Sequence, residues 1–213
     1  MFDLYVITDR RLSHGLSEAE VARLAYAGGA DIVQLRMKSE DGKEMLEQAK
    51  IIKQYADEYA RYFIVNDRVD IAILSDADGV HLGQSDIPIA EARKLLGDDK
   101  LIGISVHNVE EAITAFNDGA DYIGVGSIFT TSTKPDAVQG LGLDAIYRIK
   151  QAVDLPLVAV GGINQGNIQD VIAAGADSAA VVSAVVGKED ISKACHDLRD
   201  QILKIRPHTV VGQ

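Results

Sequence analysis

The sequence has few of the residues that build disulfide scaffolds and thiolate metal sites. It contains one cysteine, Cys195, in 213 residues, no tryptophan and only four prolines. A single thiol forms neither an internal disulfide nor a thiolate metal site, so we expect it to pack within a C-terminal helix. Because no Pro-rich or low-complexity stretch marks a linker, we expect one domain over residues 1–206 and a frayed tail at 207–213.

Positive charge and long apolar runs are also scarce. The chain has 21 Lys and Arg residues against 32 Asp and Glu residues, a formal net charge of −11. This charge disfavours general affinity for nucleic acid or anionic membranes, which both require a positive surface. No apolar run reaches membrane-spanning length, and the charges at Asp3 and at 9–11 interrupt the first one. We therefore expect a soluble cytoplasmic protein acting on small molecules, compatible with a homo-oligomer, without nucleic-acid or membrane partners.

Short runs rich in Val, Ile and Tyr alternate with amphipathic stretches along the whole chain. This alternation is typical of βα units with a parallel sheet. Eight units in about 200 residues fit the lower size limit of a closed barrel, so the predicted fold is α/β, a single-domain (β/α)8 TIM barrel. The expected strands cover residues 4–8, 32–37, 62–65, 79–82, 101–106, 122–128, 157–161 and 179–183. The expected helices include 18–27, 42–59, 89–96, 109–117, 143–152, 165–173 and 191–205.

Three similar joints between a helix and the following strand support the barrel. They are Gly29-Ala30-Asp31, Gly119-Ala120-Asp121 and Gly175-Ala176-Asp177. A glycine just after a helix supplies the left-handed turn at which the helix ends. We interpret these joints as structural features of one end of the barrel.

The second expected strand carries an unusual polar pattern at its end. In the segment 34–38, Gln34, Arg36 and Lys38 face one side, while Leu35 and Met37 face the other. Burying two cations in a stretch without a carboxylate is unfavourable unless an anion meets them. The pattern predicts a ligand that carries negative charge.

Polar residues or glycines follow most of the other expected strands. In a barrel the carboxyl ends of all strands meet at one rim, where active sites lie. The residues in question are Asn66, Asp67, Asp86, Ser105, His107, Thr131, Ser132, Thr133, Lys134, Gly161, Gly162 and Ser183. We therefore expect an active site at this rim. For His107 a structural role with a hydrogen-bonding partner is favoured over a general base.

Asp67 and Asp86 follow neighbouring strands and are candidate metal ligands. Mg²⁺ favours a few carboxylates combined with substrate phosphates and water, so two protein ligands suffice. The alternative for each carboxylate is to cap the helix that follows it.

The segments after strands 6, 7 and 8 are candidate phosphate sites. Gly161-Gly162 and Ser183-Ala184 occupy positions where barrels commonly bind a phosphate through backbone N–H groups. The segment 131–134 adds three hydroxyls and a cation, which suit an anionic ligand. The alternatives are a tight turn at the glycines and a solvated loop at 131–134.

These motifs together resemble the thiamine phosphate synthase family. The resemblance rests on residues 34–38, 65–72, 79–86, 103–107, 131–134, 160–163, 175–177 and 182–183, in family order and approximate spacing. It implies condensation of 4-amino-5-hydroxymethyl-2-methylpyrimidine diphosphate with a (carboxy)thiazole phosphate, giving thiamine phosphate and pyrophosphate. The thiazole nitrogen is then the nucleophile.

The resemblance also implies roles for individual residues. The pyrimidine diphosphate would contact Gln34, Leu35, Arg36, Met37, Lys38, Asn66, Ser105 and Lys134, among which Arg36, Lys38, Ser105 and Lys134 would be catalytic. The thiazole phosphate would contact Thr131, Ser132, Thr133, Gly162, Val182 and Ser183. Asp67 and Asp86 would bind the cofactor Mg²⁺.

Two other functions are compatible with a phosphate-binding barrel. The related thiazole tautomerase isomerises a thiazole phosphate without a diphosphate donor, so it does not need Asp67, Asp86 and Lys134 together. A non-catalytic sensor of phosphate ligands would bind the thiazole phosphate without Mg²⁺-dependent turnover.

Replacing Lys134 tests the expected stabilisation of the departing diphosphate. We predict that Lys134→Ala lowers turnover, because the cation no longer offsets the charge that develops on the leaving group. Steady-state assays at saturating substrate measure this effect. Unchanged turnover would remove Lys134 from that role.

Overall fold

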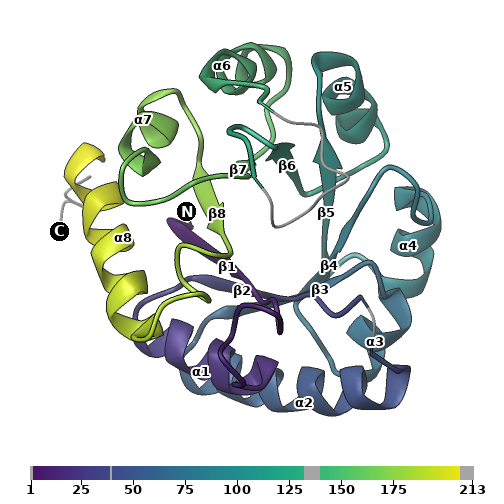
Figure 1. Ribbon diagram of the computed structural model, residues 1–213. Helices are drawn as coiled ribbons and strands as arrows, with labels where there is room; N and C mark the ends of the chain where they lie inside the picture. Colours follow the sequence, from purple (N-terminus) through teal and green to yellow (C-terminus); the bar gives the residue numbers. More distant parts are fainter. Residues whose placement is uncertain (1, 39, 132–139, 207–213) are drawn as a thin grey trace, which may run out of the picture.

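Eight parallel strands alternate with eight helices and close into a barrel, in which β1 pairs with both β2 and β8 (Figure 1). This computed structural model describes residues 2–38, 40–131 and 140–206. The strands are β1 (Leu4–Ile7), β2 (Ile32–Leu35), β3 (Tyr62–Asn66), β4 (Gly79–Leu82), β5 (Leu101–Val106), β6 (Tyr122–Gly126), β7 (Leu157–Val160) and β8 (Ser178–Val181). The helices are α1 (Glu18–Ala27), α2 (Gly42–Glu58), α3 (Val69–Leu74), α4 (Ile89–Leu96), α5 (Val109–Asn117), α6 (Leu143–Ala152), α7 (Ile168–Ala173) and α8 (Ile191–Ile205). The predicted (β/α)8 fold is confirmed.

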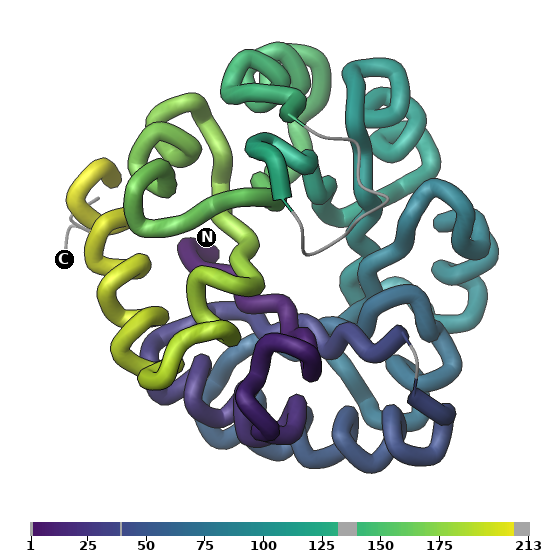
Figure 2. Tube along the Cα trace, in the orientation of Figure 1, coloured from purple at the N-terminus to yellow at the C-terminus, as the bar shows by residue number. Residues whose placement is uncertain are grey.

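The helices form a ring around the strands (Figure 2). Successive residues of each strand therefore point in turn outward, to a layer between strands and helices, and inward, to the interior of the barrel. The larger layer lies between strands and helices and includes Leu35 and Met37. Cys195 is also buried in this layer, within α8, as expected. The smaller layer fills the barrel with Tyr5, Ile32, Ile64, Tyr122, Val158 and Ala180. Within the described residues, no helix combines the length and apolarity that a membrane span requires.

Four aspartates close the amino-terminal end of the barrel by one repeated contact. Each precedes an even-numbered strand, and its carboxylate accepts a backbone N–H from the start of the preceding odd-numbered strand. The pairs are Asp31 with Leu4 (3.2 Å), Asp78 with Phe63 (2.8 Å), Asp121 with Ile102 (2.7 Å) and Asp177 with Leu157 (2.8 Å). Each carboxylate also pairs with a cation, namely Arg61, Lys53, Arg93 or Lys150. The aspartates of the three Gly-Ala-Asp joints, together with Asp78, therefore make the same structural contact four times.

At the opposite rim, the end of one strand and the start of one helix differ from the expectation. β2 ends at Leu35 rather than at residue 37, because the backbone N–H of Arg36 donates to the Thr8 hydroxyl instead of to a strand (3.0 Å). α7 begins at Ile168 rather than at residue 165, because the N–H groups of Gly166 and Asn167 donate to Asn164 in a turn before the helix. The expected tail at 207–213 lies outside the described residues.

Asp31 is the best position to test the carboxylate contacts. Its side chain is 8% exposed, pairs with Arg61 and accepts the N–H groups of Asp3 and Leu4. We predict that Asp31→Ala destabilises the protein by about 2–3 kcal/mol, because it leaves two N–H groups and a cation without their acceptor. Urea unfolding measures this change. The matched control is Asp98→Ala at an exposed position, where we expect at most about 0.5 kcal/mol; equal losses in both variants would contradict the assigned role.

Candidate active site

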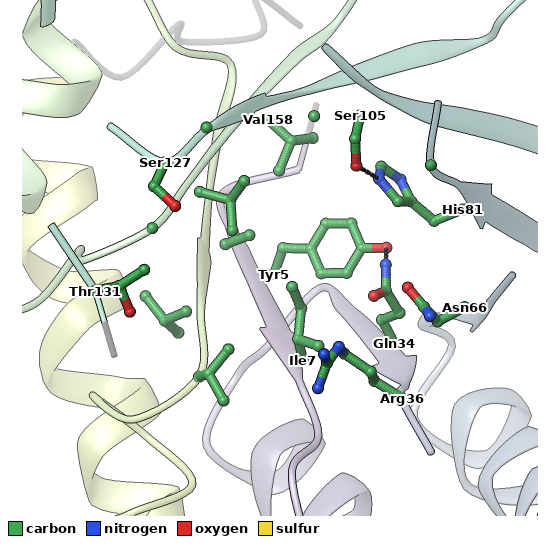
Figure 3. A pocket seen from close by; sticks show the side chains of 18 of the residues that line it. Tyr5, Ile7, Gln34, Arg36, Asn66, His81, Ser105, Ser127, Thr131 and Val158 are labelled. Carbon is green, nitrogen blue, oxygen red and sulfur yellow. Dashed lines mark hydrogen bonds between the residues drawn. The ribbon is translucent and has the colours of Figure 1, made fainter. Parts of the chain in front are cut away.

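A cavity of about 770 Å³ opens at the carboxyl-terminal end of the barrel (Figure 3). Among the expected site residues, those lining it are Gln34, Arg36, Lys38, Asn66, Asp67, Asp86, Ser105, Thr131, Gly162, Val182 and Ser183. Leu35 and Met37 are not brought to it, because the alternation of β2 points both side chains into the outer hydrophobic layer. Ser132, Thr133 and Lys134 lie outside the described residues.

The two cations of the second βα unit have carboxylate partners from other parts of the chain. Arg36 Nη1 lies 3.7 Å from Asp9 Oδ2, and Lys38 Nζ pairs with Asp67. Burial opposes ionisation of Asp9, but hydrogen bonds and charge from Arg11 outweigh it and lower the pKa of this carboxyl. The Arg36 contact exceeds hydrogen-bond length, so it does not engage the guanidinium donors fully. Arg36 therefore keeps donors for an incoming anion, whereas an anion at Lys38 competes with the Asp67 carboxylate.

Asp67 and Asp86 form the carboxylate pair expected at this rim. Burial, together with the neighbouring Asp67 carboxylate, raises the pKa of Asp86. Asp86 Oδ2 also accepts the backbone N–H of Gly83 at 2.6 Å. Neither aspartate caps a helix, because α3 begins after Arg68 and α4 begins after Pro88.

This pair suits a divalent cation. Two carboxylates close enough for one to raise the pKa of the other gain from a positive ion between them. No cluster of three or more His, Cys, Asp or Glu ligands occurs among the described residues. The donor set is therefore one of hard oxygens with few protein ligands, as Mg²⁺ prefers.

The opposite side of the cavity is built from backbone. Gly161 and Gly162 have φ of 99° and 67°. A Cβ on Gly161 would lie 2.5 Å from Ser127 Cβ, and one on Gly162 would lie 2.7 Å from Phe129 Cβ. After β8, Val185 and Val186 donate their N–H groups back to Val182, so the chain makes a helical turn. Glycine is therefore required at positions 161 and 162, where the main chain can approach a ligand closely.

Sequence reasoning missed several side chains of the cavity, among them Tyr5, His81 and Tyr122. His81 lies between two apolar residues of a short strand, and both tyrosines lie in apolar strands, where an aromatic ring ordinarily indicates core. The available signal was strand alternation, which points all three into the barrel. His107 also lines the cavity, and its Nδ1 lies 2.9 Å from Glu111 Oε2.

Comparison with known proteins indicates the family to which the chain belongs. The family model described as thiamine monophosphate synthase matches residues 4–185. A thiamine-phosphate synthase of Chloroflexus aurantiacus is 52% identical over 196 residues, which cover 92% of this chain and 90% of that protein. A thiamine-phosphate synthase of Methanoculleus marisnigri is 49% identical, with 94% of this chain and 95% of that protein covered.

A solved structure supports the same relationship. The thiamine phosphate pyrophosphorylase from Pyrococcus furiosus superposes with a TM-score of 0.87 and 43% sequence identity, covering 96% of each chain. The family model and the curated relatives each extend over most of this sequence. The chain therefore belongs to the thiamine monophosphate synthase family and is a transferase of thiamine biosynthesis.

Proposed function

We propose that the protein condenses 4-amino-5-hydroxymethyl-2-methylpyrimidine diphosphate with a (carboxy)thiazole phosphate to give thiamine phosphate and pyrophosphate. The observation that carries the proposal is a single cavity with two chemically different sides. One side holds Arg36, Lys38, Asp67 and Asp86, and the other holds the backbone of Gly162 and Ser183. Such a cavity suits two phosphorylated substrates held with their reactive ends together.

The charged side would hold the pyrimidine diphosphate. Arg36 and Lys38 supply donors for the diphosphate oxygens, and the Ser105 hydroxyl supplies another. Gln34 and Asn66 offer amide groups to the aminopyrimidine ring. Lys134, outside the described residues, would add a further cation.

Asp67 and Asp86 would hold Mg²⁺ on this side. The ion would supply positive charge against the leaving diphosphate. The other contributions come from the chain itself: Arg36 and Lys38 bind the same oxygens, and Asp67 holds the Lys38 ammonium in place.

The backbone side would hold the thiazole phosphate. Thr131 offers a hydroxyl, while Gly162, Val182 and Ser183 line the cavity where N–H groups can donate to phosphate oxygens. Ser132 and Thr133, outside the described residues, belong to the same proposal.

The reaction then requires positioning rather than a protein nucleophile. The bond from the pyrimidine methylene carbon to oxygen breaks, and its electron pair leaves with the diphosphate. The thiazole nitrogen lone pair forms the new carbon–nitrogen bond. Ile7, Val158 and Val160 give the cavity apolar walls, which would limit the access of water to the methylene carbon. Burial raises the pKa of Cys195 to about 12, so this thiol is not a competing nucleophile. A cytoplasmic location belongs to the same proposal.

Product formation tests the proposed reaction directly. With both substrates and Mg²⁺, we predict equal amounts of thiamine phosphate and pyrophosphate, and loss of both products with EDTA. Chromatography and a pyrophosphate assay on the same sample measure them together. Binding of thiazole phosphate without either product would contradict the synthase proposal and favour a tautomerase or a sensor.

A single substitution tests the proposed metal ligands. We predict that Asp86→Asn weakens Mg²⁺ binding by about tenfold or more, because one of two anionic ligands becomes neutral. Isothermal titration calorimetry with Mg²⁺ measures the affinity. Asp98→Asn removes the same charge from an exposed turn after α4 and should leave the affinity unchanged. Equal Mg²⁺ affinity in Asp86→Asn and the unmodified protein would exclude Asp86 as a ligand.

A further inference from the structure

Five side chains from five different strands form a hydrogen-bonded chain across the cavity. Gln34 Nε2 donates to the Tyr5 hydroxyl at 2.8 Å, and the hydroxyls of Tyr5 and Tyr122 lie 3.2 Å apart. The Tyr122 hydroxyl lies 3.1 Å from His81 Nδ1, and His81 Nε2 lies 3.0 Å from Ser105 Oγ. The Gln34–Tyr5 and His81–Ser105 contacts appear as dashed lines in Figure 3. The chain therefore joins two residues, Gln34 and Ser105, that the proposed function assigns to the pyrimidine diphosphate.

The positions of the hydrogens can follow either of two arrangements. In the first, Tyr5 donates to Tyr122, Tyr122 donates to His81 Nδ1, and His81 Nε2–H donates to Ser105. The spare hydrogen is then on Ser105, which is partly exposed and lines the cavity. In the second arrangement, Ser105 donates to His81 Nε2, His81 Nδ1–H donates to Tyr122, and Tyr122 donates to Tyr5. The hydrogen without an acceptor is then on Tyr5.

Burial decides between these arrangements. Tyr5 is 1% exposed. In the second arrangement, the Tyr5 oxygen accepts hydrogen bonds from Gln34 and from Tyr122. The hydrogen of the Tyr5 hydroxyl then has no acceptor among these five side chains. A buried donor without an acceptor costs about 1–3 kcal/mol. Burial also raises the pKa of both Tyr5 and Tyr122, so each keeps its hydrogen at neutral pH and can donate it. The first arrangement satisfies every buried donor.

The barrel leaves space for the two rings at the centre of this chain. A Cβ on Gly103 would lie 2.0 Å from Tyr122 Cζ, and one on Gly124 would lie 2.9 Å from His81 Cε1. These glycines lie on β5 and β6, next to the rings that they accommodate. Gln84 also holds the Ser105 carbonyl, through a hydrogen bond of 2.8 Å from its Nε2. Both ends of the His81–Ser105 contact are thus held in place.

We propose that Tyr5, Tyr122 and His81 are positioning residues that make Ser105 a hydrogen-bond donor toward the cavity. His81 Nε2–H occupies a lone pair of the Ser105 hydroxyl, so the hydroxyl hydrogen points to the ligand. An oriented donor suits the anionic oxygens of a diphosphate, and this part of the inference rests on the proposed function. Tyr122 determines which His81 nitrogen carries the hydrogen, because its hydroxyl donates to Nδ1.

The ¹⁵N NMR spectrum of the histidine rings tests the direction of the chain without any assay of activity. We expect His81 to carry its hydrogen on Nε2 and none on Nδ1 at neutral pH, with the signal assigned by its loss in His81→Gln. A hydrogen on Nδ1, in either the neutral or the charged ring, would overturn the proposal. This result holds whether or not the protein makes thiamine phosphate, so it separates this inference from the proposed reaction.

A double-mutant cycle tests the functional consequence. We expect Tyr122→Phe to lower kcat by about tenfold, and to have little further effect when Ser105 is already alanine, because both changes remove one oriented donor. Tyr26→Phe is the matched control, because the buried Tyr26 hydroxyl donates to the Tyr62 carbonyl outside this chain. Full additivity of Tyr122→Phe with Ser105→Ala, or an equal loss of kcat in Tyr26→Phe, would overturn the positioning role.

Discussion

Closure of the barrel is the constraint on which the rest of the structure depends. Because β1 pairs with β8 as well as β2, alternate residues of all the strands point into one shared interior. Tyr5 and Tyr122 are 117 positions apart in the chain, yet their hydroxyls meet there. In an open sheet these side chains would lie along one face without converging. The cavity and its hydrogen-bonded chain are therefore consequences of closure.

The two ends of the barrel have different roles. The amino-terminal end stabilises the fold, and the carboxyl-terminal end forms the candidate active site. At the amino-terminal end, carboxylates such as Asp31 satisfy backbone N–H groups and pair with cations. At the other end, Asp67 has a positive φ, and consecutive glycines at 161 and 162 take left-handed conformations beside the cavity. Backbone strain and clustered charge cost stability. The hydrogen bonds and ion pairs of the amino-terminal end stabilise the barrel that carries this rim.

Charge at the cavity is balanced locally, within a chain whose net charge is −11. Arg36 has Asp9 nearby, and Lys38 pairs with Asp67. The expectation of two buried cations is wrong for Lys38, because its side chain is 51% exposed. The sequence of 34–38 contains no carboxylate, and this absence alone suggested that a ligand must supply the negative charge. The structure changes that interpretation: the protein supplies part of it, and an incoming anion competes with existing partners.

The sequence by itself determined the eight βα units, the joints at Asp31, Asp121 and Asp177, and the inward face of Gln34, Arg36 and Lys38. All three depend on local periodicity or on turn chemistry, which neighbouring residues specify. Only the tertiary structure decided which residues meet across the barrel: the partners of Arg36 and Lys38, and the contacts among Tyr5, Tyr122, His81 and Ser105. Strand alternation in the sequence had already placed Leu35 and Met37 on the face away from the cavity, and the structure agrees, whereas the family resemblance had grouped them with their neighbours. The physical reason is that adjacent strand residues point to opposite faces, whereas residues from distant strands converge only when the barrel closes.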